Sequence, residues 1–495
     1  MRIKKFSAIE IFLSVVSACL LLSIFLKAIF DLSPDYDVGW YHHPFAARIW
    51  GIIPSELFTS GDKIEYRYDG FPLLAHFFQG MLWKLTGQIE TTNLVGYLSI
   101  IVYLIFLRQQ FKIPLYISAI AIYTIPAVIT HATVSFVDLL GNIGASMALM
   151  MTYNFFRQSR LPDKQEILFA FLGAAVAVNT KPQLQPLIFV LWFVVLLRLL
   201  WLYLQDRNTG KIYSQVLATV LASMLIFATP IKNTVLYGNP LYPIKIQVAG
   251  IVLNHEMTPE TYEEGNRREK WIRSVFEVDT PKWTPAQWNY NDNRYFDRAG
   301  GFFAAYVVFN LLLLLACVCS ETIRNLKLLP NKRKRSGITA LCIMLALSLY
   351  TANFPQSHEL RYLMTWMITL VSLNLHLVFS ERVLFSSKRI SIIRNFQLVY
   401  LIFFLVMCIK IESKYLMPQF EGISSYLDVI SNQEEILSQI SPNQRNCVVS
   451  YYLSTVPINS VFYLSSYFHP DLKIEYGIEV APDIDSCQST NIINP

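Results

Sequence analysis

Charged residues are scarce in this sequence. Asp, Glu, Lys and Arg make up 15% of the 495 residues, and hydrophobic residues make up 54%. A soluble domain carries about 25% charged residues, so the chain is too apolar for that class. The net charge of +6 does not indicate a nucleic-acid partner. The basic residues lie in short loops and form no stripe interleaved with stacking aromatic residues.

Motifs for nucleotides and metals are also missing. The predicted external loops contain neither a P-loop nor a G-x-G-x-x-G segment. No C-x-x-C pair occurs, so neither a zinc ribbon nor a dithiol redox site is indicated. Five of the seven cysteines lie in apolar runs, where packing is the expected role. Cys447 and Cys487 lie near the C-terminus, in a region expected to face an oxidising compartment, and are predicted to form a disulfide. Two buried free thiols are the alternative.

Long apolar runs recur along the chain, and each is long enough to cross a bilayer about 30 Å thick. We therefore predict an all-α polytopic membrane protein with about eleven transmembrane helices. The expected spans are 8–30, 91–107, 113–131, 136–156, 166–180, 183–204, 212–231, 301–319, 337–354, 361–379 and 395–411. The first is too long for a signal-peptide core, so we interpret it as a retained anchor. A shorter apolar segment, 71–86, is predicted to be an external juxtamembrane helix.

The loops between these spans alternate in charge. Every second loop is basic, as the positive-inside rule requires, and the short loops between them are nearly free of positive charge. The N-terminus is therefore expected in the cytoplasm, and the loops 31–90 and 232–300 and the tail are expected outside. The basic residues are Arg2, Lys4, Lys5, Arg108, Lys112, Arg157, Arg160, Lys164, Arg207, Lys211, Lys332, Arg333, Lys334, Arg335, Arg382, Lys388, Arg389 and Arg394.

Residues 413–495 differ in composition from the rest of the chain. The segment "SSYLDVISNQEEILSQI" has the pattern of an amphipathic helix, and "NCVVSYYL", "VFYLSSYF" and "LKIEYGIEV" are typical of short strands. We predict a small external α/β C-terminal module after a transmembrane domain that covers 1–412.

The stretch "DLSPDYDVGWYHHP" follows the first apolar run directly. It contains three acids, of which Asp35 and Asp37 lie beyond the end of the run, and then Tyr41, His42 and His43. The next segment, "PFAARIWGII", is amphipathic and is expected to lie along the membrane, which would keep these side chains near the bilayer surface. A solvated, turn-rich loop is the alternative interpretation.

Three further charged residues point to the same outer surface. Asp138 lies near the outer end of an apolar run, where an acid is costly unless it faces a polar cavity or a partner. Lys181 and Arg361 break the positive-inside pattern on that side. Together they favour a phosphate site at the outer leaflet. The alternatives are a satisfied structural acid and two cations that extend to the interface.

These motifs, in this order, resemble the type-C glycosyltransferases, which use polyprenyl-phosphate sugars. The closest likeness is to the branch of protein O-mannosyltransferases and aminoarabinose transferases. The stretch "DVGWY" matches the acid and tyrosine of that branch with Asp37 and Tyr41, but Val38 stands where the family has its second acid. The segments "FPLLAHFFQGMLWKLTG", "NTKPQ", "YGNPLYP" and "LRYLM" match later motifs, the last through Arg361 and Tyr362.

The resemblance implies an inverting glycosyltransferase that acts on an envelope glycolipid, polysaccharide or protein. It implies that Asp37 is the general base and that Lys181 and Arg361 bind the phosphate. Asp138 would hold Lys181, His43 or a divalent cation, although no ligand spacing requires a metal. Asp35, Tyr41, His42, His43 and Tyr362 are the remaining candidate substrate-binding residues. An O-antigen polymerase or ligase and a lipid-linked sugar flippase or transporter are the alternatives.

The chain contains no N-x-S/T sequon. That absence fits a bacterial plasma membrane, the inner membrane, with the C-terminal module in the periplasm.

Overall fold

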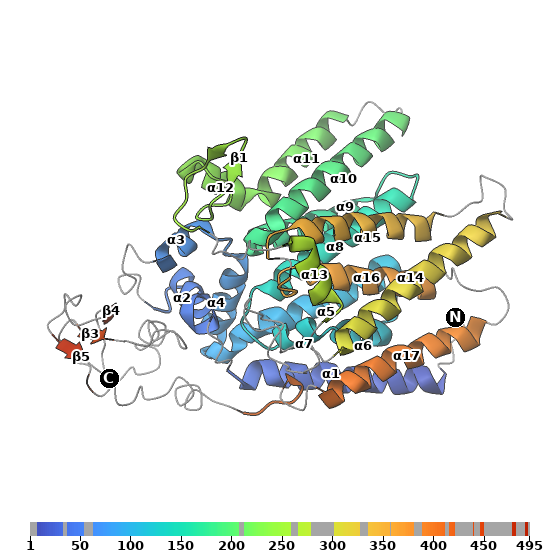
Figure 1. Cartoon of the computed structure of the whole chain (residues 1–495), viewed down its shortest axis with the longest axis horizontal. Coiled ribbons are helices and arrows are strands. Elements are labelled where there is room, and N and C mark those ends of the chain that lie inside the picture. The colour runs from blue at the N-terminus through green and yellow to red at the C-terminus, as the bar shows by residue number, and fades with distance from the viewer. Residues whose placement is uncertain are drawn as a thin grey trace.

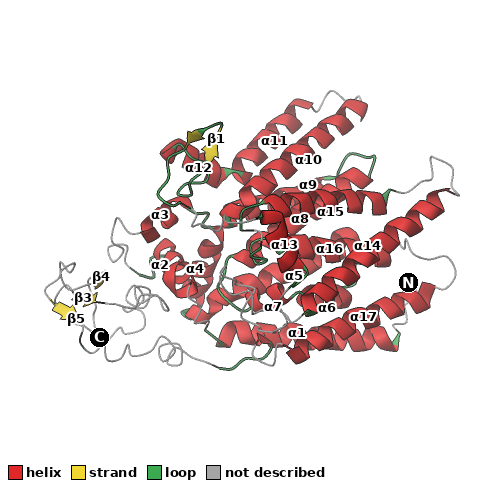
Figure 2. Cartoon of the chain, viewed as in Figure 1, coloured by secondary structure: helices red, strands yellow, loops and turns green. Residues whose placement is uncertain are grey.

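The computed structural model of the chain is mostly helical (Figure 2). It describes residues 7–32, 37–53, 63–206, 212–258, 266–278, 301–326, 335–356, 358–380, 389–410, 415–420, 439, 446–449, 478–481 and 491–493. Within these ranges, strands form a two-stranded ribbon and a three-stranded sheet. The expected helical fold is confirmed.

Each of the eleven expected spans corresponds to one helix or to two consecutive helices. These are α1 (Ala8–Phe30), α5 (Leu94–Phe111), α6 (Leu115–Tyr123) with α7 (Pro126–His131), α8 (Asp138–Arg157), α9 (Lys164–Thr180), α10 (Gln185–Asp206), α11 (Ile212–Ile226), α14 (Phe302–Leu326), α15 (Ser336–Asn353), α16 (Thr365–Leu375) and α17 (Arg389–Lys410). Many of them run roughly along the long axis of the molecule (Figure 1).

Five helical segments of the described chain are long and apolar enough to cross a membrane. They are Ala8–Phe30, Ile89–Phe111, Pro182–Gln205, Phe302–Leu326 and Ser336–Asn353. A sixth results if α11 and α12 (Ala228–Tyr237), which are bent by 69°, form one span. The chain thus carries several candidate transmembrane helices, while the number eleven stays a prediction.

The expected span 113–131 is interrupted, as is 212–231 at the bend between α11 and α12. The run 113–131 is broken between α6 and α7 at Ile125, which has an extended backbone with φ −77° and ψ 114°. Pro126 explains this break, because proline lacks a backbone N–H and disfavours helical geometry in the residue before it.

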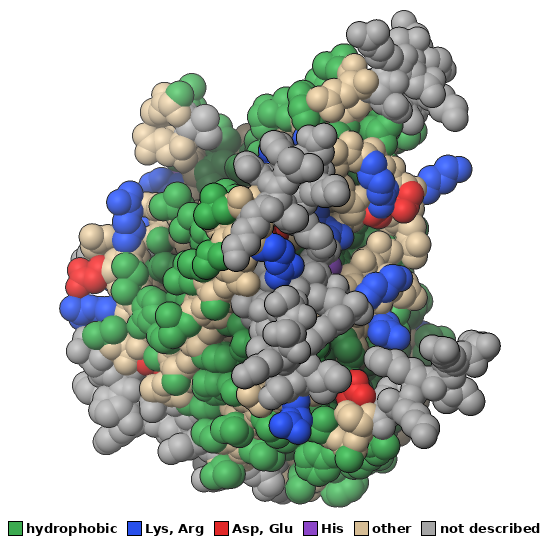
Figure 3. All heavy atoms as spheres, turned by 90° about the vertical axis from the view of Figure 1, so that its right-hand side faces the viewer, with side chains coloured by type: hydrophobic (Ala, Val, Ile, Leu, Met, Phe, Trp, Pro, Cys, Tyr) green, Lys and Arg blue, Asp and Glu red, His purple; other side chains and the backbone are tan. Residues whose placement is uncertain are grey.

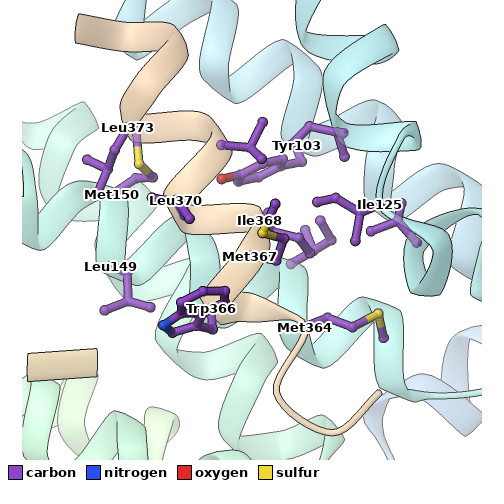
Figure 4. Packing of buried hydrophobic residues seen from close by; sticks show 14 of the residues in the cluster. Tyr103, Ile125, Leu149, Met150, Met364, Trp366, Met367, Ile368, Leu370 and Leu373 are labelled. Carbon is purple, nitrogen blue, oxygen red and sulfur yellow. The ribbon is translucent and has the colours of Figure 1, made fainter. Parts of the chain in front are cut away.

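The core lies around α16, in which every residue is buried. Figure 4 shows Trp366, Met367, Ile368 and Leu370 among side chains from other helices, including Tyr103. Nearby, α8 and α9 approach closely at two glycines. A Cβ on Gly144 would lie 2.7 Å from the carbonyl oxygen of Gly173, and a Cβ on Gly173 would lie 2.7 Å from that of Gly144. This close crossing fixes α8 against α9, which ends just before Lys181.

Short helices lie between the long ones on the predicted outer side. They are η1 (Val38–His42), α2 (His43–Ile49), α3 (Lys63–Gly70), α4 (Leu74–Thr86) and η3 (Ile89–Asn93), followed later by η4 (Pro182–Leu184) and α13 (Arg267–Val275). The ribbon of β1 (Gln247–Val248) and β2 (Ile251–Val252) follows α12. A helix over 71–86 was predicted, and α4 provides it. The π-helical segment η8 (His376–Ser380) continues α16.

Basic residues gather at the opposite end of the molecule. The start of α1, the end of α14 and the starts of α15 and α17 all lie at the right-hand end in Figure 1. Figure 3 looks onto this end and shows more Lys and Arg side chains than acidic ones among apolar surface. This is the end that the positive-inside rule predicts to be cytoplasmic.

The C-terminal tail is described in part. Strands β4 (Ile478–Ala481), β3 (Asn446–Val449) and β5 (Asn491–Ile493) form a parallel sheet in that order, with Cys447 opposite Glu479 and Ile492. The predicted strands 446–453 and 472–480 overlap β3 and β4, and β5 was not expected. The predicted amphipathic helix and the strand 461–468 lie outside the described residues.

A short segment links the tail to the C-terminal end of α1. The Asp31 carboxylate accepts hydrogen bonds from the backbone N–H groups of Gln419, at 2.9 Å, and Phe420, at 2.8 Å, and pairs with Lys27 at 2.5 Å. Asp31 is therefore a structural anchor at the start of the loop after α1.

Candidate active site

The loop after α1 places Asp37 and Tyr41 on one turn. Asp37 directly precedes η1, and the backbone N–H of His43 donates to the carbonyl of Val38 to close that π-helical turn. The Arg67 guanidinium from α3 lies 5.3 Å from the centroid of the Tyr41 ring. Burial, and then the charge of Asp37, raise the pKa of Tyr41, so its phenol stays protonated at neutral pH.

The turn before α16 meets this loop. Nη1 of Arg361 lies 3.3 Å from Oδ2 of Asp37, and Nε lies 3.3 Å from Oε2 of Glu359. Nη2 of Arg361 donates to the hydroxyl of Tyr362 at 3.0 Å. One guanidinium therefore lies between two carboxylates, and its side chain is 13% exposed.

The second cation of the site is Lys181, in the connection between α9 and α10. Its ammonium contacts the carboxylate of Asp138, the first residue of α8, and both side chains are buried. Nζ of Lys181 also lies 4.2 Å from the centroid of the Tyr362 ring. Tyr362 thus contacts both cations, which lie in segments far apart in the sequence.

Polar contacts along α8 fix the turn before α16. Nδ2 of Asn142 donates to the carbonyl of Arg361 at 3.2 Å, and its Oδ1 accepts from the backbone N–H of Thr365 at 2.8 Å. The hydroxyls of Ser146 and Thr365 lie 2.9 Å apart. Asn142 lies one helical turn after Asp138 on α8. Its contacts with the backbone of Arg361 and Thr365 hold the Arg361 ion pairs close to the Asp138–Lys181 pair.

The two histidines of the stretch "DLSPDYDVGWYHHP", His42 and His43, contact side chains of other segments. Nδ1 of His42 lies 2.8 Å from Nε2 of His76 on α4, and Nε2 of His43 lies 3.1 Å from the hydroxyl of Thr92. Burial lowers the pKa of His43 and of His76 to about 3, so both imidazoles are neutral near pH 7. Of the partners expected for Asp138, the one in contact is Lys181, whereas His43 bonds to Thr92 and Ser135.

Three of the candidate positions lack a complete structural account. Asp35 and Cys487 lie outside the described residues, and Cys447 lies on β3. Within the part of the chain that the structure covers, no group of three His, Cys, Asp or Glu side chains is placed to hold a metal ion.

Two residues of the site were not predicted from the sequence. Glu359 lies two positions before Arg361 and is 5% exposed, and Arg67 lies behind Tyr41. An acid directly before a predicted outer span end, in "SHELRYLMTW", was the available signal for Glu359.

Comparisons by sequence find no match: no known family profile and no curated protein resembles this chain significantly. Comparisons by structure find ArnT from Cupriavidus metallidurans. The crystal structure of ArnT bound to undecaprenyl phosphate matches with a TM-score of 0.51 at 12% identity, covering 96% of this chain and 90% of that chain. The apo structure of ArnT matches with a TM-score of 0.47 at 12% identity, covering 96% and 86%.

This likeness extends over nearly the whole chain, and the ordered motifs had pointed to the same branch. The chain therefore has the fold of an aminoarabinose transferase, which is a type-C glycosyltransferase fold.

Proposed function

We propose that this protein is an integral membrane glycosyltransferase. It transfers a sugar from a polyprenyl-phosphate donor to a glycolipid, polysaccharide or protein of the cell envelope, on the outer face of a bacterial plasma membrane. The observation that carries the proposal is the Asp37–Arg361 contact beside the Asp138–Lys181 pair. Residues from widely separated segments meet there as two acids and two cations.

The chemistry assigns one role to each pair. Asp37 removes the proton from an acceptor hydroxyl, and the freed oxygen attacks the anomeric carbon from the side opposite the phosphate. The bond between the anomeric carbon and the phosphate oxygen breaks, and its electron pair leaves with the polyprenyl phosphate. Arg361 and Lys181 stabilise the negative charge that develops on that group. The configuration at the anomeric carbon is inverted.

The positions of the remaining polar residues fit this scheme. Asp138 holds Lys181 in place by direct contact, and Tyr362 packs against both cations. Tyr41, with its phenol protonated, supplies a donor beside Asp37. His42 and His43 stay candidates for substrate contact, and their contacts with His76, Thr92 and Ser135 position the first loop.

A polyprenyl phosphate is the carrier that the comparisons favour. The structure of ArnT with undecaprenyl phosphate has the same fold. In the topology proposed here, about eleven spans place the N-terminus in the cytoplasm and residues 413–495, as a separate α/β module, outside. Donor sugars at the outer leaflet would arrive attached to a lipid, since nucleotide sugars are not supplied there.

The test is reconstitution of the purified protein in lipid with radiolabelled polyprenyl-phosphate sugars and candidate envelope acceptors. Transfer of label to an acceptor is the expected result. Movement of the intact lipid-linked sugar across the bilayer without transfer would instead identify a flippase or transporter. Repeated extension of one glycan chain would identify a polymerase.

A further inference from the structure

Glu359 is a buried carboxylate that the scheme above does not use. Its side chain is 6% exposed, and Oε2 lies 3.3 Å from Nε of Arg361. The Tyr362 side chain also hydrogen-bonds to it. A buried charge is costly unless it is paired. Replacing a buried ion pair with apolar residues of similar volume is often neutral or stabilising for the fold. A carboxylate at this position therefore points to a function.

The charges of the paired network do not balance. Arg361 is shared between Asp37 and Glu359, while Lys181 pairs with Asp138. Among the described residues of these ion pairs, three carboxylates face two cations, and a third cation, Arg67, lies beside Tyr41. An anionic phosphate that binds Arg361 and Lys181 would add negative charge close to all three carboxylates, in a region where water screens poorly. Phosphate binding becomes more favourable if one carboxylate takes up a proton.

Glu359 is the carboxylate for which proton uptake is least costly. Asp138 is in direct contact with the ammonium group of Lys181. Asp37 is 26% exposed, so water stabilises its charge. Glu359 is 6% exposed, less than Asp37, and shares Arg361 with Asp37. Burial raises the pKa of Glu359, although Arg361, the Tyr362 hydrogen bond and Lys181 oppose that effect.

We propose that Glu359 takes up a proton when a lipid phosphate binds to Arg361 and Lys181, which makes it a proton-coupled positioning residue of the donor site. The inference rests on the proposed function. In the neutral form, one carboxyl oxygen still accepts from Nε of Arg361, so the guanidinium keeps its orientation. The phosphate then approaches the Nη1 edge, which contacts Asp37 in the free protein.

The experiment measures the pH dependence of lipid phosphate binding by the full-length protein in nanodiscs. The probe is the methyl diester of undecaprenyl phosphate, whose single charge is constant between about pH 5.5 and pH 8.5, so the ligand itself does not titrate. Wild-type affinity should fall as pH rises, by up to about tenfold per pH unit. Glu359→Gln keeps the acceptor for Arg361 and imitates the neutral acid. Its affinity should be independent of pH and, at the highest pH, at least equal to that of the wild type.

A matched control is Glu166→Gln. Glu166 is also a buried glutamate paired with an arginine, Arg160 at 2.7 Å, but it lies at the other end of the helices, so this variant should keep the wild-type pH dependence. Size-exclusion profiles and melting temperatures establish that the variants fold.

Each outcome decides the question. A Glu359→Gln variant that keeps the wild-type slope, or that binds ten times more weakly at high pH, overturns the role of Glu359. Loss of the slope in Asp37→Asn alone assigns the proton to Asp37 and overturns it as well. Wild-type binding without any pH dependence refutes this inference but leaves the proposed function intact, whereas no binding at any pH refutes both.

Discussion

Nη1 of Arg361 lies 3.3 Å from Oδ2 of Asp37, although 324 positions separate the two residues in sequence. The contact joins the first external loop to the turn before α16. In the proposed reaction these residues serve opposite ends of the transfer, since Asp37 takes the acceptor proton and Arg361 holds the leaving phosphate. A phosphate that binds Arg361 competes with Asp37 for the same edge of the guanidinium, so donor binding would release the base.

The two cations should be required for donor binding. Lys181→Ala and Arg361→Ala should each weaken polyprenyl phosphate binding by at least about tenfold, because each removes a charge-assisted contact to the phosphate. Lys181→Ala should also cost about 3–5 kcal/mol of stability, since buried Asp138 loses its partner. Binding to nanodisc-embedded protein and thermal melting measure the two effects.

A double variant separates binding from folding. Asp138→Asn with Lys181→Gln removes both buried charges, so it should recover stability without recovering affinity. Lys84→Ala, at an exposed position on α4, is the control and should bind normally. Wild-type affinity in Lys181→Ala and Arg361→Ala would mean that these cations only extend toward the interface.

Acid should destabilise the first external loop through its neutral histidines. The pKa values of His43 and His76 are lowered by burial from 6.5 to about 3. Stability is therefore complete above about pH 6.5 and is lost as pH falls below it, because only the unfolded chain binds those protons. At pH 5 each group should cost of the order of 2 kcal/mol.

Melting temperatures between pH 7 and pH 5 test this effect. His43→Gln should show a smaller loss than the wild type, while His255→Gln, at a less buried histidine, should behave like the wild type. Equal losses in all three proteins would contradict neutral burial of His43.

The topology follows from the alternating basic loops. Reporter fusions after residues 45, 265 and 440 should give external signals, and fusions after 110, 160, 208, 333 and 388 should give cytoplasmic ones. A cytoplasmic signal after residue 440 would contradict both the span count and the external tail.

The tail should contain a disulfide between Cys447 and Cys487. In the chain-entropy model, closing a loop of about 40 residues stabilises the tail by up to about 4 kcal/mol. Alkylation with a membrane-impermeant reagent, followed by mass spectrometry of the unreduced and reduced protein, measures the bond. Modification of both thiols without prior reduction would exclude it.

The sequence predicts much of this site because membrane charge rules are strict. Lys181 and Arg361 stood out as cations at short loops on a side whose short loops are otherwise nearly free of positive charge, and Asp138 stood out as an acid in an apolar run. The structure places each of them beside another member of the candidate set. Glu359 was missed because an acid in a loop is usually solvated, and only tertiary packing shows that it is buried.

The contacts of His42 and His43 could not be predicted from the sequence. His42 and His43 follow Asp37 closely in sequence and were predicted to contact substrate, and their partners His76, Thr92 and Ser135 come from other segments that local sequence does not reveal. These contacts depend on packing rather than on local preference. The two helix breaks, by contrast, have local signals: Pro126 lies at the break between α6 and α7, and Pro230 follows the bend between α11 and α12, where its ring clashes with the carbonyl of Ile226 and no N–H can bond to it.

The most direct test of the account is the turnover of Asp37→Asn. The substitution keeps the side-chain volume and removes the base, so transfer should fall by about 10²–10⁴-fold while expression and donor binding stay near wild type. Asp31→Asn, at the structural anchor, should retain most activity. Asp35→Asn should have intermediate activity if Asp35 replaces the second acid of the family, in whose place this chain has Val38. Near-wild-type turnover by Asp37→Asn, with Asp35→Asn inactive, would contradict the account and place the base two residues earlier.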